Sequence, residues 1–515
     1  MADDFIFQFF NNTNKAELSF AYTFLAFIVA VLISLMQNKK AIYIVLGIFA
    51  FLDITQLGYL AYFGSYLQPV IIPLVFTEIP EIALAGFGEF YKSYYAFIAV
   101  GLPYSILYWG FKKYNFKLYK VKYIWLLLLF LLCYFPKRAI ESESIGKLTG
   151  NYERPSLYNG LKVYNGYFFN ILLKKQEPLK FEPYTITKKT PQDVNIIIVY
   201  GESFNYHNQH LFGYQLKTTP LLDKLAKTDK NFKYKKGIAS AVTTSTSLSS
   251  FFNMQKEPQN YSIQIKQDFN IFRLAKEQEY KTYLISAQTK GILANVGIQY
   301  TDVAITKFDE KKIFETIGDE GLIDILKRYD IENGKNLIVL HQRSMHAPYW
   351  TNYSHKEKEF AKFTKNDYKF NEKQSEYINY DNNMLYNDYI LNGMIEYFKK
   401  SKKPFYLFIT SDHGELSGQL EGKSGHGILE KEVSEVPMFF YTNVNDSDVE
   451  RDFVKKRNVT HYEIGEMVLK IMGYTLKNPN TPNNVFYVNG TDLMGRYGYM
   501  KVIKSKKDVE YEIVK

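Results

Sequence analysis

The sequence predicts an α/β protein in which an N-terminal helical transmembrane domain precedes a large α/β domain with a mostly parallel central sheet. Long uncharged stretches occur before residue 137. After residue 190, short β-branched and aromatic runs alternate with helix-like segments, which is typical of parallel sheets. We therefore divide the 515 residues into a membrane domain at 1–136, a bridge along the membrane surface at 137–190 and an outer domain at 191–515.

Four apolar stretches predict about four membrane spans: residues 18–36, 41–63, 94–111 and 121–136. The first carries no charge over 19 residues. At ~1.5 Å per residue it can cross a hydrocarbon core of ~30 Å. The second is interrupted only by Asp53, for which we expect either a polar pathway or a hydrogen-bonding partner.

Lysines in the connecting loops predict the orientation of these spans. The first loop carries Lys39 and Lys40, and the third carries five lysines between positions 112 and 122. Both loops are expected on the cytoplasmic side. The second loop, 64–90, has no Lys or Arg, so it is expected outside. Four spans then place everything after residue 136 outside as well.

The outer domain contains five runs that favour strands, with helix-like segments between them. The expected strands are 195–200, 281–287, 336–341, 404–411 and 436–442. The expected helices include 220–227, 271–278, 321–329 and 382–400. Such alternation predicts a mostly parallel sheet covered by helices on both faces.

Composition narrows the possible classes of protein. Hydrophobic residues make up 46% of the chain, which excludes a disordered protein. A single cysteine excludes an intramolecular disulfide and a zinc site built from cysteines. The net charge of +10 is spread over scattered lysines. This pattern favours attraction to anionic lipid, and nucleic-acid binding is not expected.

Potential metal ligands follow three of the expected strands, at the edge of the sheet where α/β proteins form their sites. Glu202 follows the strand 195–200, the pair Asp412-His413 follows 404–411, and His346 lies beyond 336–341. Carboxylates with imidazole suit zinc, and manganese less well. A hydroxyl beside the metal would be polarised for attack, with phosphorus as the natural electrophile.

Each of these signals alone has a plain structural explanation. A Glu or Asp-His pair after a strand often caps a helix or accepts hydrogen bonds, and the hydroxyl-rich run 243–250 could be an ordinary loop. Their joint placement at three strand ends is what favours a metal site.

The whole chain resembles bacterial phosphoethanolamine transferases, the membrane-anchored, sulfatase-like branch of the alkaline phosphatase superfamily. The segments that carry the resemblance are YGESFNYHNQHLFGYQLKTTPLL, HQRSMHAPY, YINYDNNMLYNDYIL, SDHGE and SGHG followed by EVPMFFYT. This resemblance implies a sulfatase-like outer domain in the periplasm, anchored to the bacterial inner membrane. Two departures are that the family commonly has five spans and that well-known members carry disulfides.

The resemblance also implies roles for individual residues. The metal ligands would be Glu202, Asp412, His413 and a nucleophilic threonine. Thr244 fits the register of that nucleophile, three residues before Ser247, and Thr243 remains the alternative. The following residues match further positions of the family: His346 and His426 as additional active-site histidines, and Thr77 and Glu81 in the loop that receives the lipid donor. Pro73 replaces a family asparagine in that loop.

The implied reaction moves phosphoethanolamine from phosphatidylethanolamine to lipid A or the lipopolysaccharide core, through a covalent intermediate on Thr244 at a zinc site. Adding an ethanolamine cation would lower the negative charge that cationic peptides need, which connects the family with polymyxin resistance. Two other hypotheses stay open. One is a related transferase that moves glycerol phosphate, and the other is a non-catalytic membrane binding protein.

Overall fold

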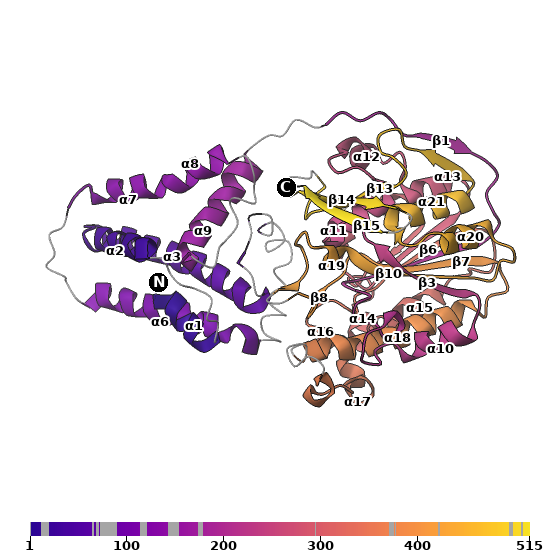
Figure 1. Cartoon of the computed structure of the whole chain (residues 1–515), viewed down its shortest axis with the longest axis horizontal. Coiled ribbons are helices and arrows are strands. Elements are labelled where there is room, and N and C mark those ends of the chain that lie inside the picture. Colours follow the sequence, from indigo (N-terminus) through magenta and orange to yellow (C-terminus); the bar gives the residue numbers. More distant parts are fainter. Residues whose placement is uncertain are drawn as a thin grey trace. The chain divides into compact units, whose positions relative to one another are not determined.

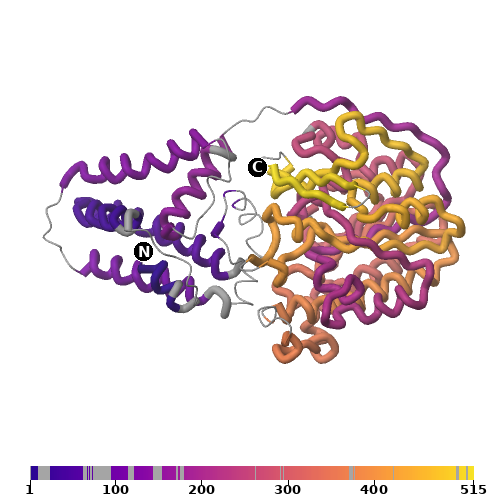
Figure 2. Tube along the Cα trace, in the orientation of Figure 1, coloured from indigo at the N-terminus to yellow at the C-terminus, as the bar shows by residue number. Residues whose placement is uncertain are grey.

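The structure is a computed structural model of the whole chain. It describes residues 2–11, 20–63, 66–67, 69, 72, 90–113, 121–142, 154–173, 179–293, 295–369, 375, 377–420, 423–493, 498–505 and 508–514. The chain forms two compact units (Figures 1 and 2). We call residues 1–177, with 422–424 and 515, the helical unit. Residues 178–421 and 425–514 are the α/β unit.

The helical unit confirms the expected N-terminal helical region. Its helices are α1 (Ala2–Asn11), α2 (Phe20–Ser34), α3 (Lys39–Phe63), α6 (Phe90–Lys113), α7 (Ile124–Leu132), α8 (Tyr134–Glu141), α9 (Ser156–Asn165) and the π-helical η2 (Gly166–Leu172). Asn38 begins α3 by accepting hydrogen bonds from the backbone N–H groups of Lys40 and Ala41. Leu32, Ile42 and Leu128 belong to one apolar core that joins α2, α3 and α7.

Within the described residues, one helix is long and apolar enough to cross a membrane, Lys39–Ala61 in α3. A shorter apolar helix covers Phe24–Ser34. The fourth expected span, 121–136, falls in α7 and α8, which meet at Cys133, a residue with right-handed helical φ and ψ angles. The four-span topology therefore stays a prediction.

Asp53 is buried in α3 and has hydrogen-bonding partners. The hydroxyl of Tyr104 donates to its Oδ2 atom at 2.6 Å, and the hydroxyl of Ser156 donates to its Oδ1 atom at 2.6 Å. Of the two explanations offered by the sequence, the contacts favour hydrogen-bond satisfaction.

An eight-stranded sheet organises the α/β unit, in the order β11-β3-β10-β7-β2-β6-β4-β5. Its strands are β2 (Asn195–Gly201), β3 (Phe232–Ile238), β4 (Lys281–Ser286), β5 (Val303–Ile305), β6 (Asn336–His341), β7 (Phe405–Ser411), β10 (Glu435–Thr442) and β11 (Val459–Thr460). Neighbouring strands are parallel except where β10 pairs with β3 and β7. The mostly parallel sheet and its five expected strands are confirmed.

Strand β3 was not expected from the sequence. Strand β11 pairs with only the last two residues of β3, Gly237 and Ile238. The rest of β3 is an open edge that carries Lys233, Lys235 and Lys236. Lysines on an edge strand oppose unwanted pairing with other chains, but they hide the strand from a search for apolar runs.

Helices surround the sheet as in Figure 1, and the four helices expected from the sequence are confirmed in α10, α13, α15 and α18. The helices are α10 (Pro220–Thr228), α11 (Thr244–Phe252), α12 (Tyr261–Lys266), α13 (Ile271–Glu277), α14 (Lys311–Ile317), α15 (Glu320–Leu326), α16 (Tyr349–Tyr353), α17 (Glu357–Phe360), α18 (Ile378–Phe398), α19 (Lys431–Ser434), α20 (Asp448–Lys455) and α21 (His461–Ile471). Short 3-10 helices are η3 (His210–Phe212), η4 (Lys290–Leu293), η5 (Ile298–Tyr300), η6 (Ser354–Lys356) and η7 (Lys365–Tyr368).

Smaller sheets complete the fold. Strand β1 (Thr185–Lys188) pairs with β12 (Tyr474–Lys477), and β13 (Val485–Asn489), β14 (Tyr499–Lys504) and β15 (Val509–Val514) form a three-stranded sheet. Strands β8 (Leu416–Ser417) and β9 (Ser424–Gly425) form a two-residue pair.

The central strand β2 is buried on both faces, and its side chains divide between two cores. Ile196 and Ile198 pack with residues of α11, α13 and α21, whereas Ile197 and Val199 pack with residues of α10, α15 and α18. This double coverage explains why the strand reads as a continuous apolar run. It also leaves the ends of the strands as the places where polar groups can gather.

Candidate active site

Strand register brings two of the expected metal-ligand segments together. Strands β2 and β7 are parallel neighbours, and Gly201 at the end of β2 lies opposite Ser411 at the end of β7. Glu202 and Asp412 are the next residues on each strand. The chain then makes a close turn at Gly414, where a Cβ atom would lie 2.8 Å from the carbonyl oxygen of Glu432.

Glu202, Asp412 and His413 form one buried group whose ligand atoms all lie within 4.8 Å of one another. The Nε2 atom of His413 is 3.2 Å from Oδ2 of Asp412 and 3.7 Å from Oε1 of Glu202. All three side chains have 1% exposure or less. The structure thus brings together the three ligand types that the sequence placed at two strand ends.

The Thr244 hydroxyl lies beside this group. Thr244 is the first residue of α11, and its Oγ1 atom is 3.2 and 3.3 Å from the two carboxylate oxygens of Glu202. The same atom is 3.3 Å from Nε2 of His413. The Thr243 hydroxyl instead donates to Oγ1 of Thr246 at 3.2 Å.

The protonation states of the group suit a cation. Burial alone would raise the pKa of Asp412, but the positive charge that His413 can carry and hydrogen bonds from the backbone N–H groups of Ser203 and His413 hold this pKa below its ordinary value. Burial lowers the pKa of His413, which favours the neutral imidazole. Its Nδ1 atom donates to the carbonyl oxygen of Gly414 at 2.9 Å, which leaves Nε2 as the electron-pair donor.

An orphaned oxygen supports the fit to a divalent metal. Oδ2 of Asp412 is buried and accepts no hydrogen bond from the described residues. Two carboxylates buried side by side repel each other unless a cation neutralises them. Oxygen and imidazole donors are those that zinc takes in catalytic sites, where one position stays open. The residues present therefore fit a zinc ion.

A second group adjoins the first and includes His426. His413, Glu415 and His426 also have ligand atoms within 4.8 Å of one another. The rings of His413 and His426 lie 4.2 Å apart, and Nδ1 of His426 is 2.8 Å from Oε2 of Glu415. The Tyr349 hydroxyl donates to the other oxygen of Glu415 at 2.6 Å. Burial opposes ionisation of Glu415, but His426 and these hydrogen bonds hold its pKa below the ordinary value.

Several contacts in this region were not expected from the sequence. Gln288 follows β4 and donates from Nε2 to Oε2 of Glu202 at 2.5 Å. Ser247, one turn along α11 from Thr244, donates to the carbonyl oxygen of Asp412 at 2.6 Å. Buried His461 accepts a hydrogen bond from the backbone N–H of Ser240 at its Nδ1 atom, 3.0 Å away. Of these three residues, Gln288 has a sequence signal in the strand end before it, and Ser247 has one in its spacing from Thr244.

The remaining expected site residues have different outcomes. The Nδ1 atom of His346 contacts the carbonyl oxygen of Ala347, and His346 belongs to neither of the two groups found among the described residues. Thr77 and Glu81 lie outside the described residues.

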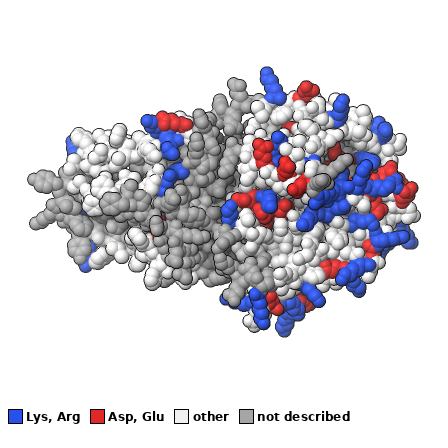
Figure 3. Space-filling model, viewed as in Figure 1, with Lys and Arg blue, Asp and Glu red and all other residues white. Residues whose placement is uncertain are grey.

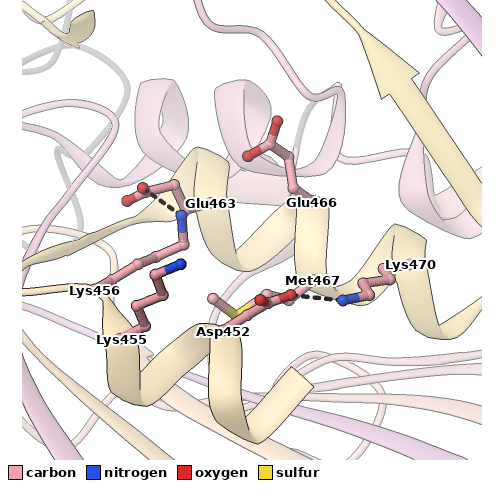
Figure 4. A pocket seen from close by; sticks show the side chains of 7 residues that line it. All are labelled: Asp452, Lys455, Lys456, Glu463, Glu466, Met467 and Lys470. Atoms are coloured by element: carbon pink, nitrogen blue, oxygen red, sulfur yellow. Dashed lines mark hydrogen bonds and ion pairs between the residues drawn. The ribbon is translucent and has the colours of Figure 1, made fainter. Parts of the chain in front are cut away.

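The α/β unit also has a surface cavity of about 480 Å³ between α20 and α21 (Figure 4). Two ion pairs cross its wall: Lys456 with Glu463 at 2.9 Å, and Lys470 with Asp452 at 2.6 Å. Burial and the nearby Glu463 raise the pKa of Glu466 to about 7. Acidic and basic side chains are mixed over the visible face of the α/β unit (Figure 3). The cavity is lined by neutralising pairs and lacks the histidines of the candidate active site.

The fold and donor set define an α/β protein with potential metal ligands and a hydroxyl grouped at the ends of its central strands. The sequence model of the family described as Sulfatase matches residues 194–474. This match covers more than half of the chain, so the chain belongs to the sulfatase family.

Within that family, the expected resemblance to phosphoethanolamine transferases is confirmed. The chain is 28% identical over 261 residues to phosphoethanolamine transferase EptA of Helicobacter pylori, covering 48% of this chain and 47% of that protein. It is 24% identical to the Kdo(2)-lipid A phosphoethanolamine 7''-transferase of Escherichia coli, covering 56% and 54%. The chain thus spans about half the length of the curated relatives it matches.

Two solved structures share the fold. Integral membrane EptA from Neisseria meningitidis aligns with a TM-score of 0.52 at 15% identity and covers 83% of each chain. The C-terminal periplasmic domain of EptC from Escherichia coli, in complex with Zn, aligns with a TM-score of 0.50 at 20% identity and covers 61% of this chain and 94% of that one.

Proposed function

We propose that this chain transfers phosphoethanolamine from phosphatidylethanolamine to lipid A or the lipopolysaccharide core, through a covalent intermediate on Thr244 at a zinc site. The observation that carries the proposal is the position of the Thr244 hydroxyl, 3.2 Å from Glu202 and 3.3 Å from His413. The names of the curated relatives supply the transferred group and the acceptor class.

Glu202, Asp412 and His413 would hold the zinc ion, with Thr244 at its open position. A bound zinc ion would make the threonine hydroxyl more acidic and neutralise charge on the phosphate oxygens. His413 is oriented for this role because its Nδ1–H is already donated to Gly414.

In the first half-reaction, Oγ1 of Thr244 forms a bond to phosphorus, and the bond from phosphorus to the diacylglycerol oxygen breaks. The threonine hydroxyl loses its proton to solvent water, which returns a proton when Thr244 is released, and another proton must reach the departing diacylglycerol oxygen. His426 is suited to deliver it, since Glu415 orients the imidazole ring by contacting its Nδ1 atom at 2.8 Å. Diacylglycerol then stays in the membrane.

In the second half-reaction, a hydroxyl or phosphate of the acceptor attacks phosphorus and releases Thr244. By microscopic reversibility, the group that protonated the first leaving group accepts a proton from an attacking hydroxyl. We assign phosphate binding to His346, and donor binding to Thr77 and Glu81.

The helical unit would anchor the enzyme in the bacterial inner membrane, with the α/β unit in the periplasm. This part of the proposal rests on the apolar helix α3 and on the lysine distribution of the loops. A reporter fused after residue 515 should be active only outside the cytoplasm, and one fused at residue 117 only inside. A cytoplasmic C-terminal reporter would contradict access to a periplasmic acceptor.

The function is tested with the full-length chain purified in detergent, lipid A and one lipid donor at a time. Transfer from phosphatidylethanolamine should add one phosphoethanolamine mass to lipid A. Transfer from phosphatidylglycerol alone would instead identify a glycerol-phosphate transferase. Absence of bound zinc together with no transfer from either donor would favour a binding protein.

A further inference from the structure

Helix α18 buries a row of polar side chains that the proposed reaction does not use. They are Tyr380, Asp381, Asn382, Asn383, Asn387 and Asp388, all with 3% exposure or less. Burying a polar group costs free energy unless it is hydrogen-bonded. The partners of these side chains therefore show which parts of the fold the helix holds in place.

Tyr380 holds the loop that follows Glu202. Its hydroxyl donates to the carbonyl oxygen of Ser203 at 2.8 Å and accepts from the backbone N–H of Asn205 at 3.2 Å. The side chain is fully buried, which raises the pKa of Tyr380 well above its usual value. A neutral phenol can donate and accept at once, as these two contacts require.

Ser203 is the residue that connects the two carboxylates of the candidate metal site. Its backbone N–H donates to Oδ1 of Asp412 at 2.9 Å, and its hydroxyl donates to Oε1 of Glu202 at 3.1 Å. Its φ angle of 53° lies in the left-handed region, which is uncommon for serine. Such a conformation persists only where neighbouring groups hold it.

The ring of Tyr380 supports the second group of the site. It packs edge to face against Tyr349, with 5.1 Å between ring centroids. The Tyr349 hydroxyl in turn donates to Glu415, which holds His426. The buried Tyr380 side chain thus contacts both the loop after Glu202 and Tyr349, and each of these holds a residue of one candidate group.

The geometry points to Tyr380 as a positioning residue whose hydroxyl holds Ser203 in its left-handed conformation, so that Glu202 and Asp412 face a metal ion together. This inference rests on the proposed function, because the metal belongs to that proposal. It adds a residue that lies 177 positions from Ser203 in the sequence.

The test compares Tyr380→Phe with Tyr386→Phe in the full-length chain. Tyr386 lies on the same helix, is equally buried, and donates to the carbonyl oxygen of Ile317 at 3.3 Å instead of to the metal-ligand loop. Each substitution removes one hydroxyl and keeps the ring. Zinc dissociation constants are measured by competition with a chromophoric chelator, and melting temperatures are measured without zinc to verify folding.

Tyr380→Phe should weaken zinc binding about tenfold, the scale seen when a group that orients a metal ligand is lost. Tyr386→Phe should stay within about twofold of the wild type. Equal zinc affinity in both variants, whether reduced or unchanged, would overturn the positioning role. A wild-type chain that binds no zinc would instead overturn the proposed metal site, and this inference with it.

Discussion

The two units of this chain bury carboxylates in different ways. In the helical unit, both oxygens of Asp53 accept a hydroxyl hydrogen bond, one from Tyr104 and one from Ser156. In the α/β unit, Oδ1 of Asp412 accepts hydrogen bonds from the backbone N–H groups of Ser203 and His413, whereas Oδ2 accepts none from the described residues. The first arrangement provides a hydrogen-bond donor for both carboxylate oxygens, and the second leaves one oxygen without a donor among these residues, 3.2 Å from Nε2 of His413.

This contrast separates two roles that a buried carboxylate can have, as a hydrogen-bond acceptor within the fold and as a candidate metal ligand. A carboxylate with hydroxyl donors on both oxygens has its hydrogen-bonding capacity met by its own surroundings. Oδ2 of Asp412 has no hydrogen-bond donor among the described residues and belongs to a group that includes the Glu202 carboxylate, an arrangement that a bound cation would stabilise. Substitutions that separate the two cases test the account of the site.

Removal of the candidate nucleophile should have the largest effect. Thr244→Ala should reduce phosphoethanolamine transfer by at least about a thousandfold, because no other hydroxyl would carry the phosphoryl group. Thr243→Ala is the matched control and should retain activity within about threefold, since its hydroxyl contacts Thr246 instead of the acidic group. Rates measured with labelled donor decide between the two residues, and the opposite ranking would move the nucleophile to Thr243.

The two buried aspartates should respond differently to an isosteric change. Asp412→Asn should weaken zinc binding by about a hundredfold or more, because it removes a charged ligand. Asp53→Asn should leave zinc affinity within about threefold, since Asp53 is a hydrogen-bond acceptor in the helical unit. Equilibrium dialysis with zinc measures both variants. An equal loss of zinc affinity in both variants would contradict the proposed difference between Asp412 and Asp53.

Glu415 should have an intermediate effect on transfer. Glu415→Gln keeps the size of the side chain but weakens its hold on Nδ1 of His426, so the rate should fall about ten- to a hundredfold. Glu257→Gln is a suitable control, because Glu257 is also buried and accepts hydrogen bonds from Asn478 and Thr481. An unchanged rate in Glu415→Gln would remove His426 from proton transfer.

A substitution in the cavity between α20 and α21 should have the smallest effect, and we expect it to change stability alone. The raised pKa of Glu466 means that the folded state binds a proton that the unfolded state loses between about pH 4.5 and about pH 7. Stability from this group is present at low pH and is lost as the pH rises. Glu466→Gln should therefore raise the melting temperature at pH 8 by roughly 1–3 °C, with little change at pH 4.

Glu463→Gln on the same helix should act with the opposite sign. Although burial opposes its ionisation, Lys504 and Lys456 hold the pKa of Glu463 below its ordinary value. Its contribution is present above pH 4.5 and is lost as the pH falls. This variant should lower the melting temperature at pH 8, and scanning calorimetry at both pH values verifies the pair. The same sign in both variants would contradict the assigned charges.

The sequence predicted those parts of the molecule that local pattern determines. Strand β2 is an unbroken apolar run, and Glu202 stands directly after it, so strand and ligand could both be found. Strand β3 could not, because lysines occupy its open edge. Contacts across long separations were also hidden: Tyr380 holds Ser203, and Gln288 holds Glu202, through the fold and not through any local motif.

The helical unit shows what the hydropathy pattern of the sequence does not predict. Apolar stretches predicted four spans, yet one helix among the described residues has both the length and the apolar composition required. Hydropathy identifies where helices form, whereas their ends depend on capping and packing that a window of sequence does not contain.

The most direct test of the central hypothesis is mass analysis of the full-length protein after incubation with phosphatidylethanolamine and no acceptor. The account predicts one added phosphoethanolamine mass, located by peptide fragmentation on Thr244 and absent from Thr244→Ala. An adduct on Thr243 would correct the position of the nucleophile and keep the mechanism. Full transfer to lipid A by Thr244→Ala, with no adduct on any hydroxyl, would contradict the covalent mechanism and favour direct attack by the acceptor.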